Sequence, residues 1–176
     1  MRMHVLETDR LILRRFTPND AEFIFRLVND PSWLRFIGDR GVRTEDDARA
    51  YVERALLGSY ARFGFGLWVV ELKHSSDAVG LCGLVKRDGL VDVDVGFALL
   101  PRARGLGHAR EAVVAVLDLA GRAFGLTRVV AIANPDNHAS LRILENTGFL
   151  REGTVRVVAD GPELALLAAS TTRSGK

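Results

Sequence analysis

Residues 102–109 combine arginine and glycine at a spacing that suits anion binding. The segment reads R-A-R-G-L-G-H-A, so Arg102, Gly105 and Gly107 form an R-x-x-G-x-G pattern directly before an amphipathic stretch. Glycine adopts left-handed backbone conformations without steric cost and allows close approach of a ligand. A helix that begins after such a turn presents unpaired N–H groups and a partial positive charge. The spacing therefore predicts that the backbone of this turn binds a diphosphate.

Two well-known phosphate-binding motifs fit the turn less well. A dinucleotide-binding fingerprint that starts at Gly105 needs a small residue where the chain has Arg110, and a Walker A loop needs a Gly-Lys-Ser/Thr ending. A nucleotide-binding α/β protein is therefore disfavoured. The spacing alone also allows an ordinary strand-to-helix turn that contains two glycines.

Two carboxylates precede the turn in the segment L-V-D-V-D-V-G-F-A-L-L. Alternation predicts a strand over residues 90–100 with Asp92 and Asp94 on one face and the valines on the core face. Neighbouring carboxylates raise each other's pKa and attract a cationic amine. The alternative is that both are solvated strand residues.

Cysteine and histidine usage points away from thiol and metal chemistry. Cys82 is the only cysteine, so an internal disulfide and a cysteine-based zinc cluster are excluded. It lies in the apolar run V-G-L-C-G-L and is expected to be a buried structural thiol. The four histidines show no metal-ligand or triad spacing, and no metal site is predicted: His4, His74, His108 and His138.

Composition is that of a globular protein without a nucleic-acid or membrane surface. The chain has 176 residues, 48% of them hydrophobic, and a formal net charge of +2 with basic and acidic residues interspersed. No signal peptide or membrane span is recognisable, so a cytoplasmic location is expected. We expect one domain over residues 1–170 and a flexible tail over 171–176. The oligomeric state, a homodimer included, is left open.

Periodicity and turn signals outline alternating strands and helices. Strands are expected over residues 10–16, 67–72, 79–85, 90–100, 128–133, 150–158 and 163–169, with an antiparallel meander in the middle and strand 128–133 parallel to the strand before the turn. Thr17 and Thr44 are expected to cap helices, Gly125 ends the helix after the turn, and a shorter helix runs from His138 to Gly148. The segment 32–42 is expected to be a loop.

These features together resemble the GNAT superfamily of acyl-CoA-dependent N-acetyltransferases. The resemblance rests on the element order, on R-x-R-G-x-G-x-A, and on N-x-x-N-x-x-S-x-x-x-x-E-x-x-G-F, which comprises Asn134, Asn137, Ser140, Glu145, Gly148 and Phe149. The segments L-E-T-D-R-L-I-L-R (6–14) and E-L-K-H-S-S-D-A-V-G-L-C-G-L (71–84) are similar to the Rim-type branch, which includes ribosomal-protein-alanine N-acetyltransferases.

The resemblance implies an α/β fold with a mixed, centrally splayed sheet of about seven strands, and acetyl-CoA as the cofactor. The coenzyme A pyrophosphate would lie on the turn, and the pantetheine would pair with the backbone near Leu99 and Leu100. Asn134 and Asn137 would lie on the other side of the cofactor, although Asn137 is equally suited to a plain N-cap. The cofactor-binding residues implied are Leu99, Leu100, Arg102, Ala103, Arg104, Gly105, Leu106, Gly107, His108, Ala109, Asn134 and Asn137.

The implied chemistry is direct attack of an amine on the acetyl thioester. Asp94 would remove the amine proton through a water, and a free N–H near Leu99 or Leu100 would stabilise the oxyanion. Many members use a tyrosine to protonate the thiolate, but this chain has none in that region. Ser140 stands at the matching position; the alternative for it is a local backbone hydrogen bond.

The acceptor is implied to be a primary amine, either a protein N-terminus or a small molecule, that enters beside residues 32–42. Trp33, Phe36 and Asp92 are the candidate substrate-binding residues, with core packing as the alternative for the two aromatic side chains. A module that binds acyl-CoA without transferring the acyl group remains the alternative function. Nucleic acids and membranes are not expected partners.

Overall fold

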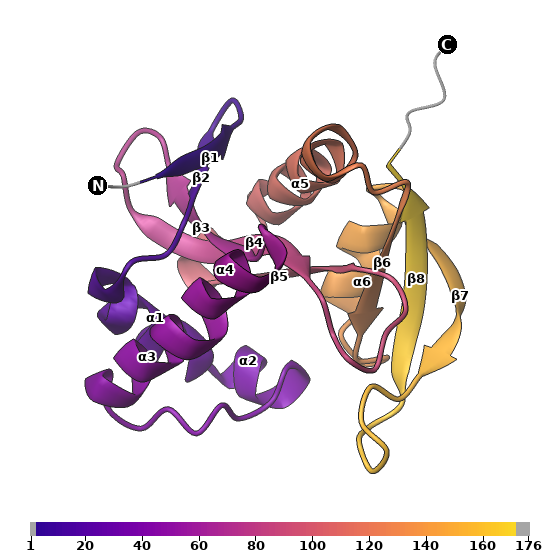
Figure 1. Ribbon diagram of the computed structural model, residues 1–176, viewed down its shortest axis with the longest axis horizontal. Helices are drawn as coiled ribbons and strands as arrows, with labels where there is room; N and C mark the ends of the chain where they lie inside the picture. Colours follow the sequence, from indigo (N-terminus) through magenta and orange to yellow (C-terminus); the bar gives the residue numbers. More distant parts are fainter. Residues whose placement is uncertain (1–2, 172–176) are drawn as a thin grey trace.

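Runs of alternating and continuous apolar residues form one open eight-stranded sheet flanked by helices (Figure 1). The structure is a computed structural model that describes residues 3–171. The strands lie in the order β1-β2-β3-β4-β5-β6-β8-β7. Their bounds are β1 (His4–Glu7), β2 (Leu11–Arg14), β3 (Leu67–Leu72), β4 (Ala78–Val85), β5 (Asp94–Leu99), β6 (Arg128–Ala133), β7 (Leu150–Val155) and β8 (Leu164–Ser170). The mixed α/β class is confirmed, and the strand beyond the expected seven is β1.

The sheet opens at its centre, between β5 and β6. The antiparallel meander β3-β4-β5 is confirmed, and β4 and β5 pair at six positions. By contrast, the parallel pair β5-β6 has a single register position, Asp94 with Val130, in the part of the chain that is described. The Val130 N–H donates to the Val93 carbonyl at 3.0 Å, and the strands then separate. This opening leaves backbone groups of β5 free of a strand partner.

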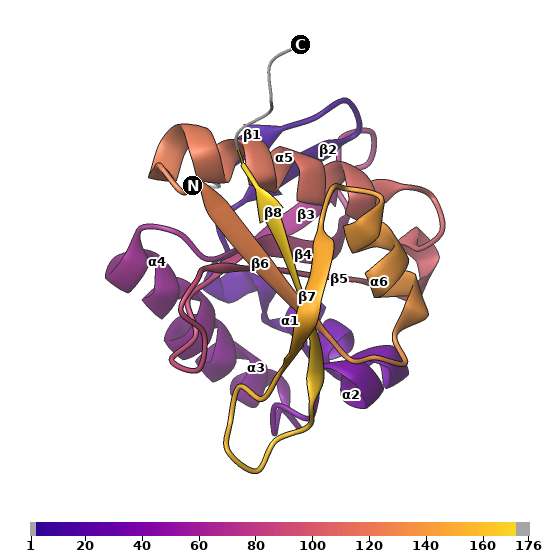
Figure 2. The ribbon, with the colours of Figure 1, turned by 90° about the vertical axis from the view of Figure 1, so that its right-hand side faces the viewer.

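Helices cover both halves of the sheet. They are α1 (Ala21–Val28), α2 (Pro31–Phe36), α3 (Glu45–Tyr51), α4 (Gly58–Phe63), α5 (His108–Phe124) and α6 (His138–Glu145), with the short 3₁₀ turns η1 (Pro18–Asp20) and η3 (Pro101–Ala103) and the π-helical turn η2 (Val52–Leu57). Figure 1 shows α1 to α4 beside the β1-β4 half. Helix α5 packs across β2, β4 and β5, and α6 packs beside β6 (Figure 2). The capping boxes at Thr17 and Thr44 and the left-handed Gly125 at the end of α5 are confirmed.

The expected loop over residues 32–42 is wrong in its first part, which is helix α2. The sequence Asn29-Asp30-Pro31 ends α1 and at the same time begins the next helix. Asp30 accepts a hydrogen bond from the Ser32 N–H at 3.1 Å, and Pro31 occupies the first helical position. The same three residues therefore give both a stop signal for α1 and a start signal for α2.

The expected strand over residues 90–100 is also wrong at its start, because β5 begins at Asp94. Val91 is 94% exposed and does not belong to the core. The Lys86 ammonium donates to the carbonyls of Leu90 and Val91 and holds this segment as a loop. Asp92 therefore does not share a strand face with Asp94.

Two large apolar clusters lie around the sheet. The first packs α5 and α6 against the strands, and the second packs α1, α2 and α3 against residues of β3 and β4. Cys82 lies in the first cluster at 1% exposure, and burial raises the pKa of its thiol, so the expectation of a structural thiol is confirmed. Within residues 3–171, no helix has the length and apolarity needed to cross a bilayer. Residues 172–176 of the expected tail lie outside the described residues.

Candidate active site

The turn that joins β5 to α5 presents a row of unpaired backbone amides. Gly105 and Gly107 have φ angles of +72° and +82°, which glycine alone adopts without strain. The N–H groups of Ala103 and Arg104 donate to carbonyls within the turn. The N–H groups of residues 105–110 donate to no group in the described part of the chain. They lead into and begin a 17-residue helix, an arrangement that favours an anion.

Side chains from distant elements fix this turn in place. The Arg10 guanidinium donates to the Leu106 carbonyl at 2.8 Å and to Glu111 of α5 at 2.6 Å. The Arg104 guanidinium donates to Asp30 at 2.6 Å and to the Leu99 carbonyl at 2.9 Å. Arg104 therefore acts as a clamp between the turn and α2. Nothing in the local sequence indicates either pairing.

Three of the turn residues that are expected to bind the cofactor have different surroundings: His108 is buried, whereas Arg102 and Leu106 are exposed. His108 is buried and its Nδ1 lies 3.2 Å from the Ala103 carbonyl, so its ring also braces the turn. Arg102 is exposed, lies 3.5 Å from Asp77 and donates to the Ala78 carbonyl. Leu106 is 57% exposed. Neither Arg102 nor Leu106 lines a cavity of this site, whereas Ala103 and Ala109 do.

A cavity of about 500 Å³ runs from the turn along β5. We call it the turn cavity. Its walls come from α2, β5, the turn and α6, and they include Trp33, Phe36, Phe97, Leu99, Ala103, Arg104, Gly105, Gly107, His108, Ala109, Asn137 and Ser140. The lining is largely apolar, with the polar groups of the turn at one end.

A second cavity of about 290 Å³ lies further along the opening of the sheet. We call it the β5 cavity. It shares six residues with the turn cavity: Trp33, Phe36, Ile37, Phe97, Asn137 and Ser140. The two cavities therefore adjoin where α2, β5 and α6 approach one another. Its charged lining residues, among those described, are Arg40, Arg87 and Asp94.

Asp94 is the buried carboxylate of the β5 cavity. It lies at the first position of β5, its side chain is 1% exposed, and both of its carboxylate oxygens lie 3.2 Å from the Arg87 Nε. Burial raises the pKa of Asp94, and Arg87 opposes this only in part. A carboxylate with a raised pKa at a cavity wall accepts a proton more readily than an exposed one.

Ser140 and Asn137 lie where the two cavities meet. The Asn137 side-chain Oδ1 accepts from the Ser140 N–H at 3.2 Å, which caps α6. Within residues 3–171, the Ser140 hydroxyl makes no hydrogen bond, so the alternative of a local backbone bond is not observed. The Asn134 side chain accepts from the Asp136 N–H at 2.9 Å, and Asn134 lines the β5 cavity but not the turn cavity.

Backbone alternation along β5 separates two amides that the sequence treats as equivalent. The Leu100 N–H donates to the Val79 carbonyl at 2.8 Å, so the expectation of a free amide at Leu100 is wrong. Alternation directs the N–H groups of Phe97 and Leu99 to the opposite side, toward the opening before β6. The Phe97 N–H is a further candidate for a free amide in this region. The sequence did not indicate it, because it depends on the point where β5 and β6 separate.

Of the three residues expected to bind the acceptor amine, two line the cavities and one does not. Phe36 is half-buried and lines both cavities, and so does Trp33, although Trp33 is only 4% exposed and its Nε1 donates to the Gly38 carbonyl. Trp33 therefore combines core packing with a place in the cavity wall. Asp92 lies outside the lining of both cavities and pairs with Arg128 at 3.1 Å.

Comparisons with known proteins agree with this architecture. Residues 10–150 match the model of the acetyltransferase (GNAT) domain family. The chain is 30% identical over 155 residues to an uncharacterised N-acetyltransferase, YoaA, of Bacillus subtilis, and the match covers 86% of each chain.

Solved structures have the same fold. A putative GNAT-family acetyltransferase from Bordetella pertussis is 28% identical with a TM-score of 0.76, over 94% of this chain and 98% of that one. RimL, a ribosomal L7/L12 alpha-N-protein acetyltransferase solved with coenzyme A, is 18% identical with a TM-score of 0.79, over 95% and 97% of the two chains.

Proposed function

The chain belongs to the acetyltransferase (GNAT) family, and on that premise we propose where it binds acetyl-CoA and how it acetylates a primary amine. Members of this family are acetyl-CoA-dependent N-acetyltransferases. The observation that carries the proposal is that Gly105 and residues 107–110, whose N–H groups are free, line the turn cavity, which adjoins the cavity that holds Asp94. Residues 1–170 then act as one N-acetyltransferase domain.

In this proposal the turn binds the diphosphate of coenzyme A. The free backbone N–H groups of the turn and the α5 dipole neutralise its charge, while Arg10 and Arg104 keep the donors in position. The opening of the sheet leaves the β5 backbone near Leu99 available to the amide groups of pantetheine. Asn137 flanks the opposite side. Bound acetyl-CoA supplies a thioester, which an amine attacks directly.

Residues near the boundary between the two cavities then have separate roles in the reaction. Asp94 takes the amine proton through a water, because its carboxylate is buried and its pKa is raised. The N–H groups of Phe97 and Leu99 stabilise the oxyanion that forms on the thioester carbonyl. When the C–S bond breaks, the excess proton on the newly bonded nitrogen passes to the thiolate, relayed by the free Ser140 hydroxyl with or without a water.

We further propose a Rim-type acetyltransferase, a branch that includes enzymes acting on protein N-termini. The fold shared with RimL and the sequence segments 6–14 and 71–84 support this assignment. A small-molecule amine is the other acceptor type that the cavities accommodate.

The test is the release of free CoA thiol from acetyl-CoA in the presence of a panel of peptide N-termini and small amines. We expect thiol release that depends on the amine, together with acetylated product in mass spectrometry. Calorimetry with CoA, run in parallel, reports binding alone. Binding without amine-dependent release would identify a non-catalytic acyl-CoA sensor, and no heat with millimolar CoA would contradict the cofactor site.

A further inference from the structure

The β5 cavity has an unusual charge balance for a site that receives an amine. Its charged lining residues, within residues 3–171, are two arginines, Arg40 and Arg87, and one carboxylate, Asp94. An amine carries a positive charge until it loses its proton. A polyamine or an aminoglycoside would bring several more positive charges toward the two guanidinium groups. The balance therefore disfavours polycationic acceptors.

Arg40 is the first source of positive charge that no carboxylate neutralises. It lies in the segment between α2 and α3 and is exposed. The carboxylate next to it in sequence, Asp39, pairs with Arg43 instead, because it accepts hydrogen bonds from both terminal nitrogens of Arg43. That contact lowers the pKa of Asp39 to about 2. Among the described residues, Arg40 forms no ion pair.

Arg87 is the second positively charged residue of the cavity, and it is paired with Asp94. Its Nε faces Asp94, while its terminal nitrogens donate to no group in residues 3–171. Its side chain is 31% exposed and lines the β5 cavity. The Nε contact orients the guanidinium with its free edge away from Asp94.

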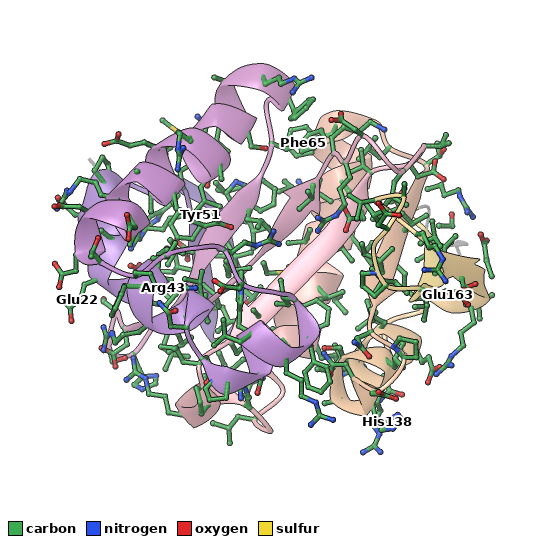
Figure 3. All side chains as sticks on the ribbon, turned by 90° about the horizontal axis from the view of Figure 1, so that it is seen from below. Glu22, Arg43, Tyr51, Phe65, His138 and Glu163 are labelled. Carbon is green, nitrogen blue, oxygen red and sulfur yellow. The ribbon has the colours of Figure 1, made fainter. Side chains whose placement is uncertain are left out.

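Tyr51 adds a neutral donor to the same wall. It is the last residue of α3 and is labelled in Figure 3, together with Arg43 of the preceding segment. Its hydroxyl donates to nothing in the part of the chain that the structure describes, and both Arg40 and Arg87 act electrostatically on it. Two guanidinium groups and a phenol thus face one cavity of about 290 Å³.

We propose that the acceptor is an amine with a carboxylate close to its amino group, and that Arg40, Arg87 and Tyr51 bind this carboxylate. The inference rests on the proposed acetyl transfer and names the substrate class of that site. Guanidinium groups form charge-assisted hydrogen bonds with carboxylates, and a phenol hydroxyl adds a third donor. The amino group of such a substrate then lies within reach of Asp94, on the other side of Arg87. The small cavity suits a single amino acid or the first residue of a peptide.

The experiment compares matched acceptor pairs in which carboxylates are replaced by uncharged amides, two in the first pair and one in the second. Free L-aspartate is compared with its uncharged diamide, and a peptide amide that begins with Asp is compared with the same peptide that begins with Asn. The first pair reports a small-molecule acceptor and the second reports a protein N-terminus. Spermidine serves as a polycationic acceptor. Each kcat/KM is corrected for the fraction of neutral amine at the assay pH.

We expect the acidic member of at least one pair to be preferred about tenfold or more in kcat/KM. Arg40→Gln should remove about tenfold of that preference through KM, and Arg40→Glu should abolish or reverse it. Arg26→Gln is the matched control, because Arg26 is exposed on α1 and lies outside both cavities. Its preference should equal that of the unmodified protein. Arg40 is exposed, so these variants should fold, which thermal melting checks.

Two outcomes would overturn the inference, and they are distinguishable. If amines are acetylated but spermidine or the uncharged members are preferred, or if Arg40→Gln leaves the preference unchanged, this substrate class is wrong while the acetyl transfer stands. If no amine in the panel is acetylated although CoA binds, the proposed transfer fails, and the substrate class fails with it.

Discussion

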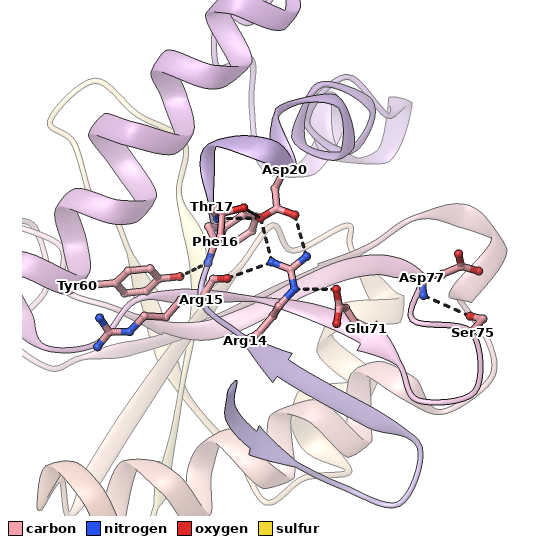
Figure 4. A network of polar contacts seen from close by, with 9 residues as sticks. All are labelled: Arg14, Arg15, Phe16, Thr17, Asp20, Tyr60, Glu71, Ser75 and Asp77. Atoms are coloured by element: carbon pink, nitrogen blue, oxygen red, sulfur yellow. Dashed lines mark hydrogen bonds and ion pairs between the residues drawn. The ribbon is translucent and has the colours of Figure 1, made fainter. Parts of the chain in front are cut away.

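Asp20 and Asp94 are both almost completely buried carboxylates with an arginine beside them, yet they are held in different ways. Asp20 belongs to a network with Arg14 and Glu71 at the junction of β2, η1 and β3 (Figure 4). Arg14 donates to Asp20 at 2.8 and 2.9 Å and to Glu71 at 2.7 Å. Asp94 has one arginine at 3.2 Å and an adjoining cavity.

For this reason the pKa values of the two carboxylates shift in opposite directions. Burial alone acts to raise the pKa of Asp20, but the hydrogen bonds from Arg14 and Thr17 outweigh it and the pKa is lowered. At Asp94 burial outweighs the contact with Arg87, and the pKa is raised. A buried carboxylate with donors on every side stabilises the fold, whereas one with a single long contact retains the capacity to take a proton.

Replacement of Arg14 by Met should produce the largest effect, on stability. It leaves Asp20 and Glu71 buried without their main donor, which should cost about 3–5 kcal/mol in the free energy of unfolding measured by urea denaturation. Arg26→Met removes an exposed ion pair and should cost less than about 1 kcal/mol. A loss below about 1 kcal/mol for Arg14→Met would contradict the structural role of the network.

Replacement of Asp94 by Asn should affect catalysis and not stability. We expect kcat to fall by roughly 10²-fold or more with the Kd for CoA nearly unchanged. Because the folded pKa is raised, the stability that Asp94 contributes is present below its unfolded pKa and is lost as pH rises through the folded pKa. At pH 7 the variant should therefore be at least as stable as the unmodified protein.

Asp118→Asn, at an exposed position on α5, is the matched control and should leave kcat unchanged. Normal turnover by Asp94→Asn would remove Asp94 from the mechanism. A large loss of stability would instead place Asp94 in the same class as Asp20.

Replacement of Gly107 by Ala tests the turn that serves the reaction. Its φ of +82° strains any residue with a Cβ, and relief of that strain should move the N–H groups at the start of α5. We expect CoA affinity in calorimetry to fall about tenfold. Gly125→Ala carries similar strain, at a φ of +63°, at the opposite end of the same helix. Equal losses of CoA affinity in both variants would contradict the assignment.

Replacement of Ser140 by Ala should have the smallest effect. A thiol has a pKa of about 8.5, so its thiolate leaves with little help from an acid and kcat should fall about tenfold or less. Acetyl-CoA KM should be unchanged, because the α6 cap uses the Ser140 N–H and not its hydroxyl. A loss as large as that of Asp94→Asn would assign Ser140 a greater part in the transfer.

Local signals in the sequence predicted the turn, both capping boxes, the end of α5 and the positions of most strands along the chain. Each depends on residues within a few positions of one another, as at Gly105, Gly107 and Thr44. Contacts between distant segments were not predictable in this way. Arg10, directly before β2, contacts the Leu106 carbonyl of the turn, and Arg104 contacts Asp30. Arg87 contacts Asp94 only because residues 86–93 form a loop and not a strand. The choice between Leu99 and Leu100 likewise needed the observed register of β4 and β5.

A single titration compares the two carboxylates directly. With ¹³C-labelled aspartate, NMR follows the carboxyl carbons of Asp20 and Asp94 in one sample, and the Asp94→Asn and Asp20→Asn variants assign the signals. Asp94 should titrate above the ordinary value of 3.8 and Asp20 below it. If Asp94 titrated at or below 3.8, it would be a structural ion-pair partner, and its assignment as the base of the reaction would be wrong.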